Sequence, residues 1–299
     1  MKLKNLGVRA LFALWSIPLG WIVVNSTFNI SSVLPILGNV PLYPVHILNI
    51  ALILLAQKEY NDMLSFEYEK NRFWLSFLWI IPALLTSYIP GKLLPFKALL
   101  FLLLVIVAAE AFFVGKGTGR WKRASLMFSG TIFLYLAGTA LIEITDSSFT
   151  SLWKWSFPSG GWLSNIGYVM VLTSVFMSDT IAYFTGSLFG KHHFSTISPK
   201  KTVEGSLGGL VASVVTMTVG FAFFGKVGLP IYFGVILGLM IGIAAQVGDL
   251  LVSSMKRYFN VKDSSQLIPG HGGILDRFDS VFFAVPVVQI VVLLFNQVK

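Results

Sequence analysis

Residues 230–252 read PIYFGVILGLMIGIAAQVGDLLV, an apolar run that carries no charged residue before Asp249. A helix needs about 20 mostly apolar residues to cross the hydrocarbon layer of a membrane. The run therefore predicts a membrane-spanning helix with Gln246 and Asp249 near one end. Similar runs recur along the chain and the alternation typical of barrel strands is absent, so the predicted fold class is all-α.

The composition agrees with a membrane protein. Of 299 residues, 55% are hydrophobic and 12% are charged, and the mean hydropathy is +0.78. Soluble domains carry about a quarter charged residues, so a water-soluble globule is excluded, and the abundant aromatic residues exclude a disordered chain. The absence of cysteine excludes disulfides, thiolate metal sites and cysteine nucleophiles.

The sequence predicts a polytopic protein with about nine transmembrane helices in a single integral-membrane domain, 1–299. The predicted spans lie near residues 8–24, 34–56, 73–89, 95–114, 124–142, 164–187, 206–224, 230–252 and 280–297. Prolines in the second span indicate that it starts late. The first five spans form an N-terminal part, 1–163, and the last four form a motif-bearing part, 164–299.

The charged residues predict the orientation. Seventeen Lys and Arg fall on the side of the N-terminus and five on the other side, so the positive-inside rule places the N-terminus in the cytoplasm. A bacterial plasma (inner) membrane is the default location. Mixed charges within 57–72 indicate a solvated interfacial loop. Glu110, inside the fourth span, receives no role.

Residues 198–205 read SPKKTVEG and lead into the seventh predicted span. Ser198 or Thr202 can cap that helix, and Lys200 and Lys201 beside its free backbone amides would form an anion site. The alternative is a positive-inside anchor next to a helix that packs closely through its glycines.

Residues 249–279 concentrate ionisable side chains around a glycine-rich turn. Carboxylates such as Asp249 and Asp276 suit Mg²⁺, which takes oxygen ligands and brings substrate phosphates with it. Lysine and arginine neutralise phosphate oxygens, and glycines beside His271 let backbone amides approach an oxyanion. Walker, zinc-type histidine and Ser–His–Asp patterns are absent from the sequence. The residues therefore predict metal-dependent phosphoryl or nucleotidyl transfer at the cytoplasmic face.

The stretch Ser253–Asp279 resembles the signature of phosphatidate cytidylyltransferases (CDP-diacylglycerol synthases). The matching positions are Ser253, Lys256, Arg257, Lys262, Asp263, Pro269, His271, Gly272, Gly273, Asp276, Arg277 and Asp279. The spacing of Asp179, Tyr183 and Gly186 and the SPKKTVEG segment are also similar to this family. The resemblance therefore covers about 175–290. Val252 departs from the pattern because many members carry Glu there, and Ser265-Gln266 replaces a more usual glycine-containing pair.

The resemblance implies an enzyme that transfers CMP from CTP to phosphatidate, giving CDP-diacylglycerol and pyrophosphate for phospholipid biosynthesis. Mg²⁺ is the implied cofactor, and a second, monovalent cation stays open. The implied partners are CTP, phosphatidate and the lipid bilayer; a homodimer is compatible with the family, and a nucleic-acid partner is not expected.

Resemblance and residue chemistry together assign three kinds of role. The predicted metal ligands are Asp249 and Asp276, with Asp179 and Asp263 as weaker candidates. The predicted catalytic residues are Asp249, Asp276, Lys256, Arg257, His271 and Arg277. The predicted substrate-binding residues are Ser198, Lys200, Lys201, Thr202, Lys262, Gly272 and Gly273. Phosphatidate is already anionic at neutral pH, so positioning and charge neutralisation are expected to supply most of the acceleration.

Two other functions remain as alternatives. One is a related CTP-dependent membrane transferase, either a polyprenol kinase or a cytidylyltransferase that acts on an ether-linked lipid phosphate. The other is a non-enzymatic lipid transporter. The transporter ranks lower because the sequence has no visible repeat and its acidic residues gather at one end of the spans, whereas transporters typically pair broken helices in repeated halves.

Overall fold

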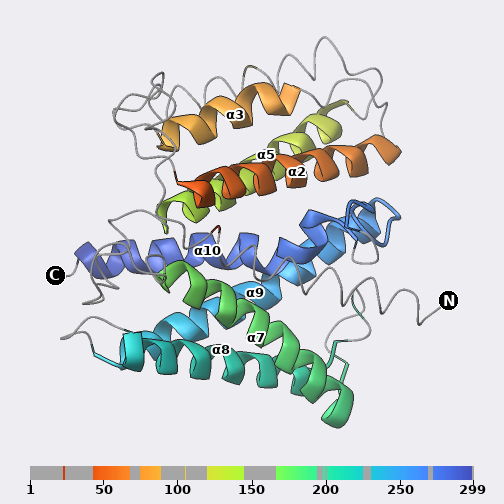
Figure 1. Cartoon of the computed structure of the whole chain (residues 1–299). Helices are drawn as coiled ribbons and strands as arrows, with labels where there is room; N and C mark the ends of the chain where they lie inside the picture. The colour runs from red at the N-terminus through yellow and green to blue at the C-terminus, as the bar shows by residue number, and fades with distance from the viewer. Residues whose placement is uncertain are drawn as a thin grey trace. The chain divides into compact units, whose positions relative to one another are not determined.

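The computed structural model describes residues 43–67, 75–88, 120–144, 166–193, 201–224, 230–268 and 272–297, together with residues 23, 105 and 198. The helices in these ranges (Figure 1) are α2 (Pro44–Glu67), α3 (Leu75–Tyr88), α5 (Arg120–Glu143), α7 (Ile166–Phe189), α8 (Val203–Phe224), α9 (Tyr232–Tyr258) and α10 (Ile274–Gln297). Within the described ranges no strand forms, apart from two isolated bridges. The predicted all-α fold class is confirmed there.

Four of these helices have the length and composition of membrane spans. They are α5 from Trp121, α7, α8 and α9, with mean hydropathies of 1.4 to 2.1 over their most apolar stretches. They agree with the predicted spans at 124–142, 164–187, 206–224 and 230–252. Apart from residues 23 and 105, the predicted spans at 8–24 and 95–114 lie outside the described residues, as does Glu110, so the count of nine stays a prediction.

The second predicted span differs from the helix observed. The expected range was 34–56, whereas α2 begins at Pro44 and continues to Glu67. Proline has no backbone N–H and a fixed φ, so it suits the first turn of a helix. Because α2 continues through 57–67, the expectation of an interfacial loop over those residues is wrong.

Helices α9 and α10 also extend further than predicted. Helix α9 reaches Tyr258 instead of ending at 252, and α10 begins at Ile274 instead of near 280. Hydropathy marks only the part of a helix that matches the hydrocarbon layer, and polar residues continue both helices past it. Lys256 and Arg257 therefore lie on the last turn of α9, and Asp276 lies on the first turn of α10.

Contacts group the chain into two units. The first unit contains α2, α3, α5 and the connection Tyr258–Arg277 between α9 and α10. The second unit contains α7, α8, α9 as far as Arg257, and α10 from Phe278 onward. Each unit is described by itself below.

Polar side chains join the three helices of the first unit. The two N–H bonds of the Gln57 side chain on α2 are shared among three acceptors: Asn61 Oδ1 (3.0 Å), Ser76 Oγ on α3 (3.2 Å) and Thr131 Oγ1 on α5 (3.3 Å). These groups are buried among apolar side chains such as Ile53 and Trp79. Buried polar groups need such partners, so the network fixes how the three helices meet.

Glycines allow α7 and α8 of the second unit to pack backbone against backbone, side by side in Figure 1. A Cβ added at Gly205 would lie 2.7 Å from the carbonyl oxygen of Ala182 and 3.1 Å from Cα of Gly186. A Cβ added at Gly209 would lie 2.8 Å from the carbonyl oxygen of Ser178. The close packing predicted from the glycines is therefore confirmed.

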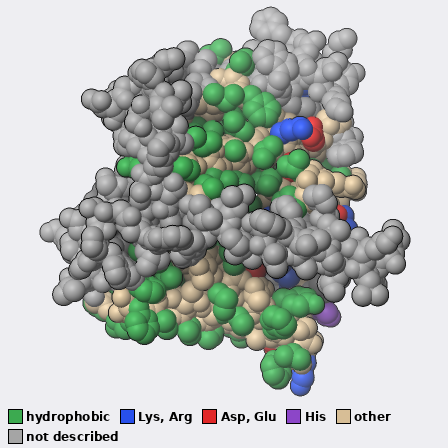
Figure 2. All heavy atoms as spheres, in the orientation of Figure 1, with side chains coloured by type: hydrophobic (Ala, Val, Ile, Leu, Met, Phe, Trp, Pro, Cys, Tyr) green, Lys and Arg blue, Asp and Glu red, His purple; other side chains and the backbone are tan. Residues whose placement is uncertain are grey.

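An apolar stripe follows the outer side of α8, where hydrophobic side chains gather in the lower part of Figure 2. Leu207, Val211, Val215, Val219 and Phe223 recur every four residues and are 49–75% exposed. Residues at this spacing share one face of a helix. An exposed apolar face on a helix of spanning length suits contact with lipid.

Ser213→Ala is expected to lower the stability of the second unit by about 1 kcal/mol. The fully buried hydroxyl of Ser213 on α8 bonds to Ser174 Oγ on α7 and to the carbonyl of Gly238 on α9, each at 2.8 Å. Thr216→Val is the control, because the Thr216 hydroxyl bonds only within its own helix. Thermal unfolding of the detergent-solubilised variants measures the difference. An equal loss in the two variants would contradict a bridging role for Ser213.

Candidate functional site

Of the two predicted caps for the helix α8, Ser198 and Thr202, the structure shows Thr202. The backbone N–H of Gly205 donates to Thr202 Oγ1 at 3.1 Å, which makes Thr202 the N-cap. Ser198 instead accepts a backbone hydrogen bond from Lys201 through its carbonyl, at 3.0 Å. The turn and the cap together hold Lys201 just before the amino end of the helix.

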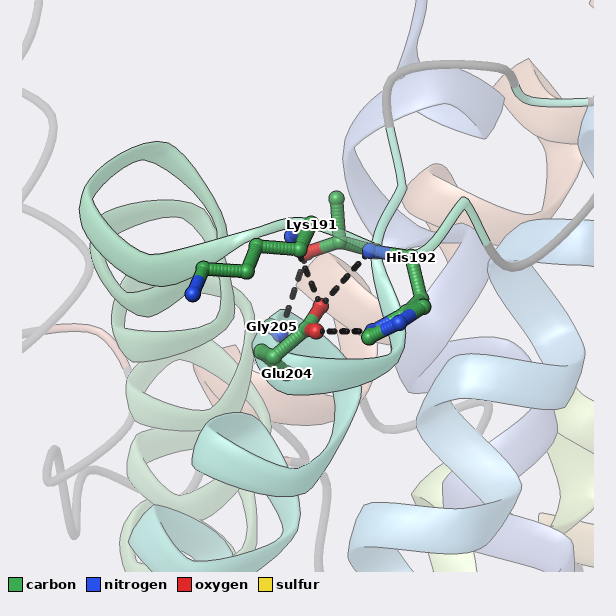
Figure 3. A network of polar contacts seen from close by, with 5 residues as sticks. Lys191, His192, Glu204 and Gly205 are labelled. Atoms are coloured by element: carbon green, nitrogen blue, oxygen red, sulfur yellow. Dashed lines mark hydrogen bonds and ion pairs between the residues drawn. The ribbon is translucent and has the colours of Figure 1, made fainter.

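Glu204 in the first turn of α8 ties this helix to the chain that leaves α7 (Figure 3). Its Oε2 accepts from the backbone N–H groups of Lys191 (3.1 Å) and His192 (3.3 Å). Its Oε1 lies 2.6 Å from Nδ1 of the exposed His192 ring. A carboxylate at a helix N-terminus is favourable, and this network holds Lys191 and His192 against the first turn of α8.

Three aspartates from three helices meet in the second unit. They are Asp179 on α7, Asp249 on α9 and Asp279 on α10, and the charge of Asp249 acts on both of the others. Asp279 is buried, whereas Asp179 is exposed at the surface of the protein. Like charges brought this close repel one another, and cations offset that repulsion.

Lysines and hydroxyl groups surround the three aspartates. Lys201 Nζ lies 2.5 Å from Asp249 Oδ2, and the nearly buried Lys256 interacts with Asp279. Ser253 donates to Asp249 at 3.2 Å, and the Ser280 backbone N–H donates to Asp279 at 2.7 Å. We call these residues the carboxylate–lysine cluster: Asp179, Lys201, Asp249, Ser253, Lys256, Asp279 and Ser280. The cluster unites four predicted site residues, Asp179, Lys201, Asp249 and Lys256. It adds Ser253 and Asp279, which were predicted only as motif positions, and Ser280, which was not predicted at all.

The cluster offers oxygen donors that fit Mg²⁺. Among the residues that the structure describes, no group of three or more His, Cys, Asp or Glu side chains could hold a metal ion. Mg²⁺ usually takes one or two carboxylates and completes its shell with waters and substrate phosphates. One or two carboxylates of the cluster, such as Asp249, would suit that mode of binding, and the lysines provide charges for phosphate oxygens.

The first unit holds a second group of predicted site residues at the start of α10. Asp276 Oδ2 accepts from the Gly273 N–H (2.9 Å) and the Ser264 N–H (2.8 Å). The Ser264 hydroxyl lies 3.0 Å from the same oxygen, and its one hydrogen is shared between Asp276 and Glu59 of α2. Gly272 has a φ of 84°, a conformation that glycine adopts readily. The backbone of this turn therefore already engages Asp276 through the amide of one predicted phosphate-binding glycine.

Glu59 on α2 completes this second group, and the sequence analysis missed it. It is only 3% exposed and accepts hydrogen bonds from the backbone N–H groups of Ile274 and Leu275, both at 2.8 Å. The signal that could have found it is helical periodicity. Ala56, Tyr60 and Met63 are buried, and Glu59 lies on the same face of α2.

The remaining predicted site residues are distributed over both units or lie outside the described residues. Lys262, Asp263 and Arg277 in the first unit and Arg257 in the second have exposed side chains. Lys200 and His271 lie outside the described residues. The predicted metal ligands Asp249 and Asp276 belong to different units, and the structure describes each within its own.

The fold and the cluster together define a class: an all-α membrane protein with carboxylates and lysines gathered across several helices. The sequence profile of the cytidylyltransferase family matches residues 21–295, and the chain belongs to this family. The match extends well beyond 175–290, where the motifs carried the resemblance, and confirms that resemblance.

Individual relatives point the same way. The chain is 45% identical over 120 residues to a phosphatidate cytidylyltransferase of Staphylococcus haemolyticus. The matched segment covers 40% of this chain and 46% of the relative. It is 40% identical over 135 residues to a phosphatidate cytidylyltransferase of Bacillus subtilis, covering 45% of this chain and 49% of the relative. The chain thus spans about half the length of the curated relatives that it matches.

Proposed function

We propose that this protein transfers CMP from CTP to phosphatidate, producing CDP-diacylglycerol and pyrophosphate. The observation that carries the proposal is the carboxylate–lysine cluster in a member of the cytidylyltransferase family. Phosphatidate and CTP both present phosphate oxygens, which lysines neutralise and which share a metal ion with carboxylates. The similarity to proteins named phosphatidate cytidylyltransferase supports this choice of substrates.

In the proposed reaction an anionic phosphate oxygen of phosphatidate attacks the α-phosphorus of CTP in line. The new P–O bond forms as the bond to the β-phosphate oxygen breaks, and pyrophosphate leaves with that electron pair. Because the attacking oxygen is already anionic, the protein needs no strong base. Its residues bind, orient and neutralise, which accounts for most of the acceleration in phosphoryl transfer.

The residues divide these tasks. Mg²⁺, when bound, supplies positive charge at the phosphate oxygens. Its proposed ligands are Asp249 and Asp276, with Asp179 and Asp263 as weaker candidates; the cluster now adds Asp279 to this set. The proposed phosphate-binding residues are Ser198, Lys200, Lys201, Thr202, Lys256, Arg257, Lys262, His271, Gly272, Gly273 and Arg277.

We also propose the membrane arrangement that the charge distribution predicts. The chain forms a single domain of about nine spans in a bacterial plasma membrane, with the N-terminus and the active-site loops in the cytoplasm. Phosphatidate then enters from the cytoplasmic leaflet, while CTP arrives from water. Four helices of spanning length and the exposed apolar stripe on α8 support an enzyme embedded in lipid.

Pyrophosphate release by the detergent-purified protein tests the proposed function. We expect release that requires CTP, phosphatidate and Mg²⁺ together, because each supplies a charge or an atom that the transfer needs. Omission of each component in turn is the control. CDP formed from CTP and a polyprenol, without pyrophosphate, would identify a kinase instead. Failure to consume CTP with any lipid phosphate would overturn the proposal.

A further inference from the structure

Glu59 is a buried carboxylate that the proposed reaction does not use directly. It lies on α2, is 3% exposed and accepts four hydrogen bonds, all from a segment more than 200 residues later in the chain. Oε1 accepts from Ser265 Oγ (2.7 Å) and the Ile274 N–H (2.8 Å). Oε2 accepts from Ser264 Oγ (2.9 Å) and the Leu275 N–H (2.8 Å).

Two of these donors, the N–H groups of Ile274 and Leu275, belong to the first turn of α10. The first N–H groups of a helix have no partner within it, and a negative charge there also complements the helix dipole. A charge buried without such partners would be strongly unfavourable. Glu59 therefore acts as a cap for α10 that comes from another helix.

The contacts continue from Glu59 to Asp276. The hydroxyl of Ser264 lies 2.9 Å from Glu59 Oε2 and 3.0 Å from Asp276 Oδ2, and the Ser264 backbone N–H also reaches Asp276. Asp276 in turn accepts from the N–H of Gly273, so it reaches back over the first turn of its own helix as in a capping box. Glu59 and Asp276 thus both bind residues 264 and 273–276: Glu59 accepts from Ser264, Ile274 and Leu275, and Asp276 accepts from Ser264 and Gly273.

Gly272 and Gly273, just before α10, lie so close to the two carboxylates that neither position has room for a Cβ atom. A Cβ added at Gly273 would lie 2.1 Å from Ser264 Oγ and 2.3 Å from Glu59 Oε2. A Cβ added at Gly272 would lie 2.7 Å from Asp276 Oδ2. The side chains of Glu59 and Asp276 occupy the space that larger residues at 272 and 273 would need.

We infer that Glu59 is a positioning residue for catalysis: it fixes the first turn of α10 and the Ser264 hydroxyl, and through them the orientation of Asp276. The inference rests on the proposed function, in which Asp276 contributes to phosphate and metal handling. Groups that orient such a residue typically change activity by about 10- to 100-fold when they are removed. Glu59 belongs to the N-terminal part of the chain, to which the sequence analysis assigned no site residue.

Glu59→Gln is a sharp test because it keeps the size of the side chain and replaces one acceptor oxygen with an NH₂ group. Serine hydroxyls can rotate to accept from that NH₂, but a backbone N–H cannot. In either orientation of the amide, one of the two N–H groups of Ile274 and Leu275 loses its acceptor. Asp62→Asn is the matched control, since it removes an acidic charge from the same helix one turn away.

Amide hydrogen exchange without substrates measures the local effect. We expect faster exchange in peptides that cover 264–276 in Glu59→Gln, and no change in peptides from α5 or in Asp62→Asn. In the same preparations kcat should fall about 10- to 100-fold and the half-saturating Mg²⁺ concentration should rise, while the KM for phosphatidate stays unchanged. Uniformly faster exchange in the first unit, with KM and the Mg²⁺ requirement unchanged, would show a merely structural role and overturn the inference.

Ser265→Ala gives a second, milder variant in case Glu59→Gln folds poorly. It removes one of the four donors, and the effects of the two substitutions should be non-additive in the double variant because both act on one network. Unchanged exchange at 264–276 in both variants would overturn the inference even if the enzyme is active. An inactive wild-type protein would overturn the proposed function, while the exchange data would still decide whether Glu59 holds this segment.

Discussion

Asp249→Asn is expected to reduce pyrophosphate release from CTP and phosphatidate by about 10²- to 10³-fold without lowering the stability of the protein. Asp249 is the member of the carboxylate–lysine cluster whose charge acts on both other aspartates, and it pairs with Lys201. Asparagine keeps the shape of the side chain and removes the charge on which metal and phosphate binding depends. Removal of one repelling carboxylate offsets the loss of the ion pair, so the midpoint of thermal unfolding should not fall.

Initial rates at saturating CTP and phosphatidate, together with thermal unfolding, measure the two effects separately. Ser254→Ala is the local control, because Ser254 lies on the same helix and has no proposed role. A variant that keeps wild-type activity would show that the cluster is not the catalytic site. A variant that loses activity together with its folded structure would instead assign a structural role to Asp249.

Gly238→Val is expected to destabilise the second unit by about 3 kcal/mol or more, a large part of the stability of an ordinary domain. A Cβ at this position of α9 would lie 2.6 Å from Cα of Val214 and 2.9 Å from the carbonyl oxygen of Ser213 on α8. Both are backbone atoms, so no side-chain rotation relieves the overlap. Replacement of a helical glycine otherwise gains at most about 1 kcal/mol in helix propensity, which is too little to compensate.

The yield of monodisperse protein in detergent and the midpoint of thermal unfolding report this loss. Val247→Ile on the same helix adds a methyl group to a side chain that is 39% exposed, and it should leave both measurements unchanged. Gly238→Ala should fall between the wild type and the valine variant. Wild-type stability of Gly238→Val would mean that α8 and α9 do not pack as closely as described.

The sequence predicted the helices best where apolar runs define them. The spans at 164–187 and 230–252 correspond to α7 and α9, because hydropathy follows the part of a helix that lies in hydrocarbon. Hydropathy did not predict the ends of helices that continue beyond the hydrocarbon layer. There α9 continues through Lys256 and α10 already contains Asp276, since backbone hydrogen bonding, and not hydropathy, decides where a helix stops.

Sequence motifs predicted the part of the candidate site that local residue patterns define, and missed the part that depends on contacts between distant segments. The motif residues Asp249 and Lys201 were recognisable by type and spacing, and the structure joins them in an ion pair. Ser198 and Thr202 were both predicted as caps because they precede an apolar helix, and the structure shows that Thr202 is the cap. The partners of Glu59 lie more than 200 residues away, and no local pattern in the sequence connects them. The helical periodicity of α2, which places Glu59 among buried residues, is the one pattern that indicates a buried carboxylate here.

The cap that α2 supplies to α10 also bears on the order of events during synthesis. Glu59 precedes Ile274 by 215 residues, and chains are made at about 5–20 residues per second, so Glu59 leaves the ribosome about 10–40 s before its acceptor role can begin. Until then its carboxylate lacks the backbone donors of α10. The full set of hydrogen bonds to Glu59 can therefore form only after residue 275 has been translated, and a nascent chain that stops before α10 leaves the Glu59 carboxylate without its Ile274 and Leu275 donors.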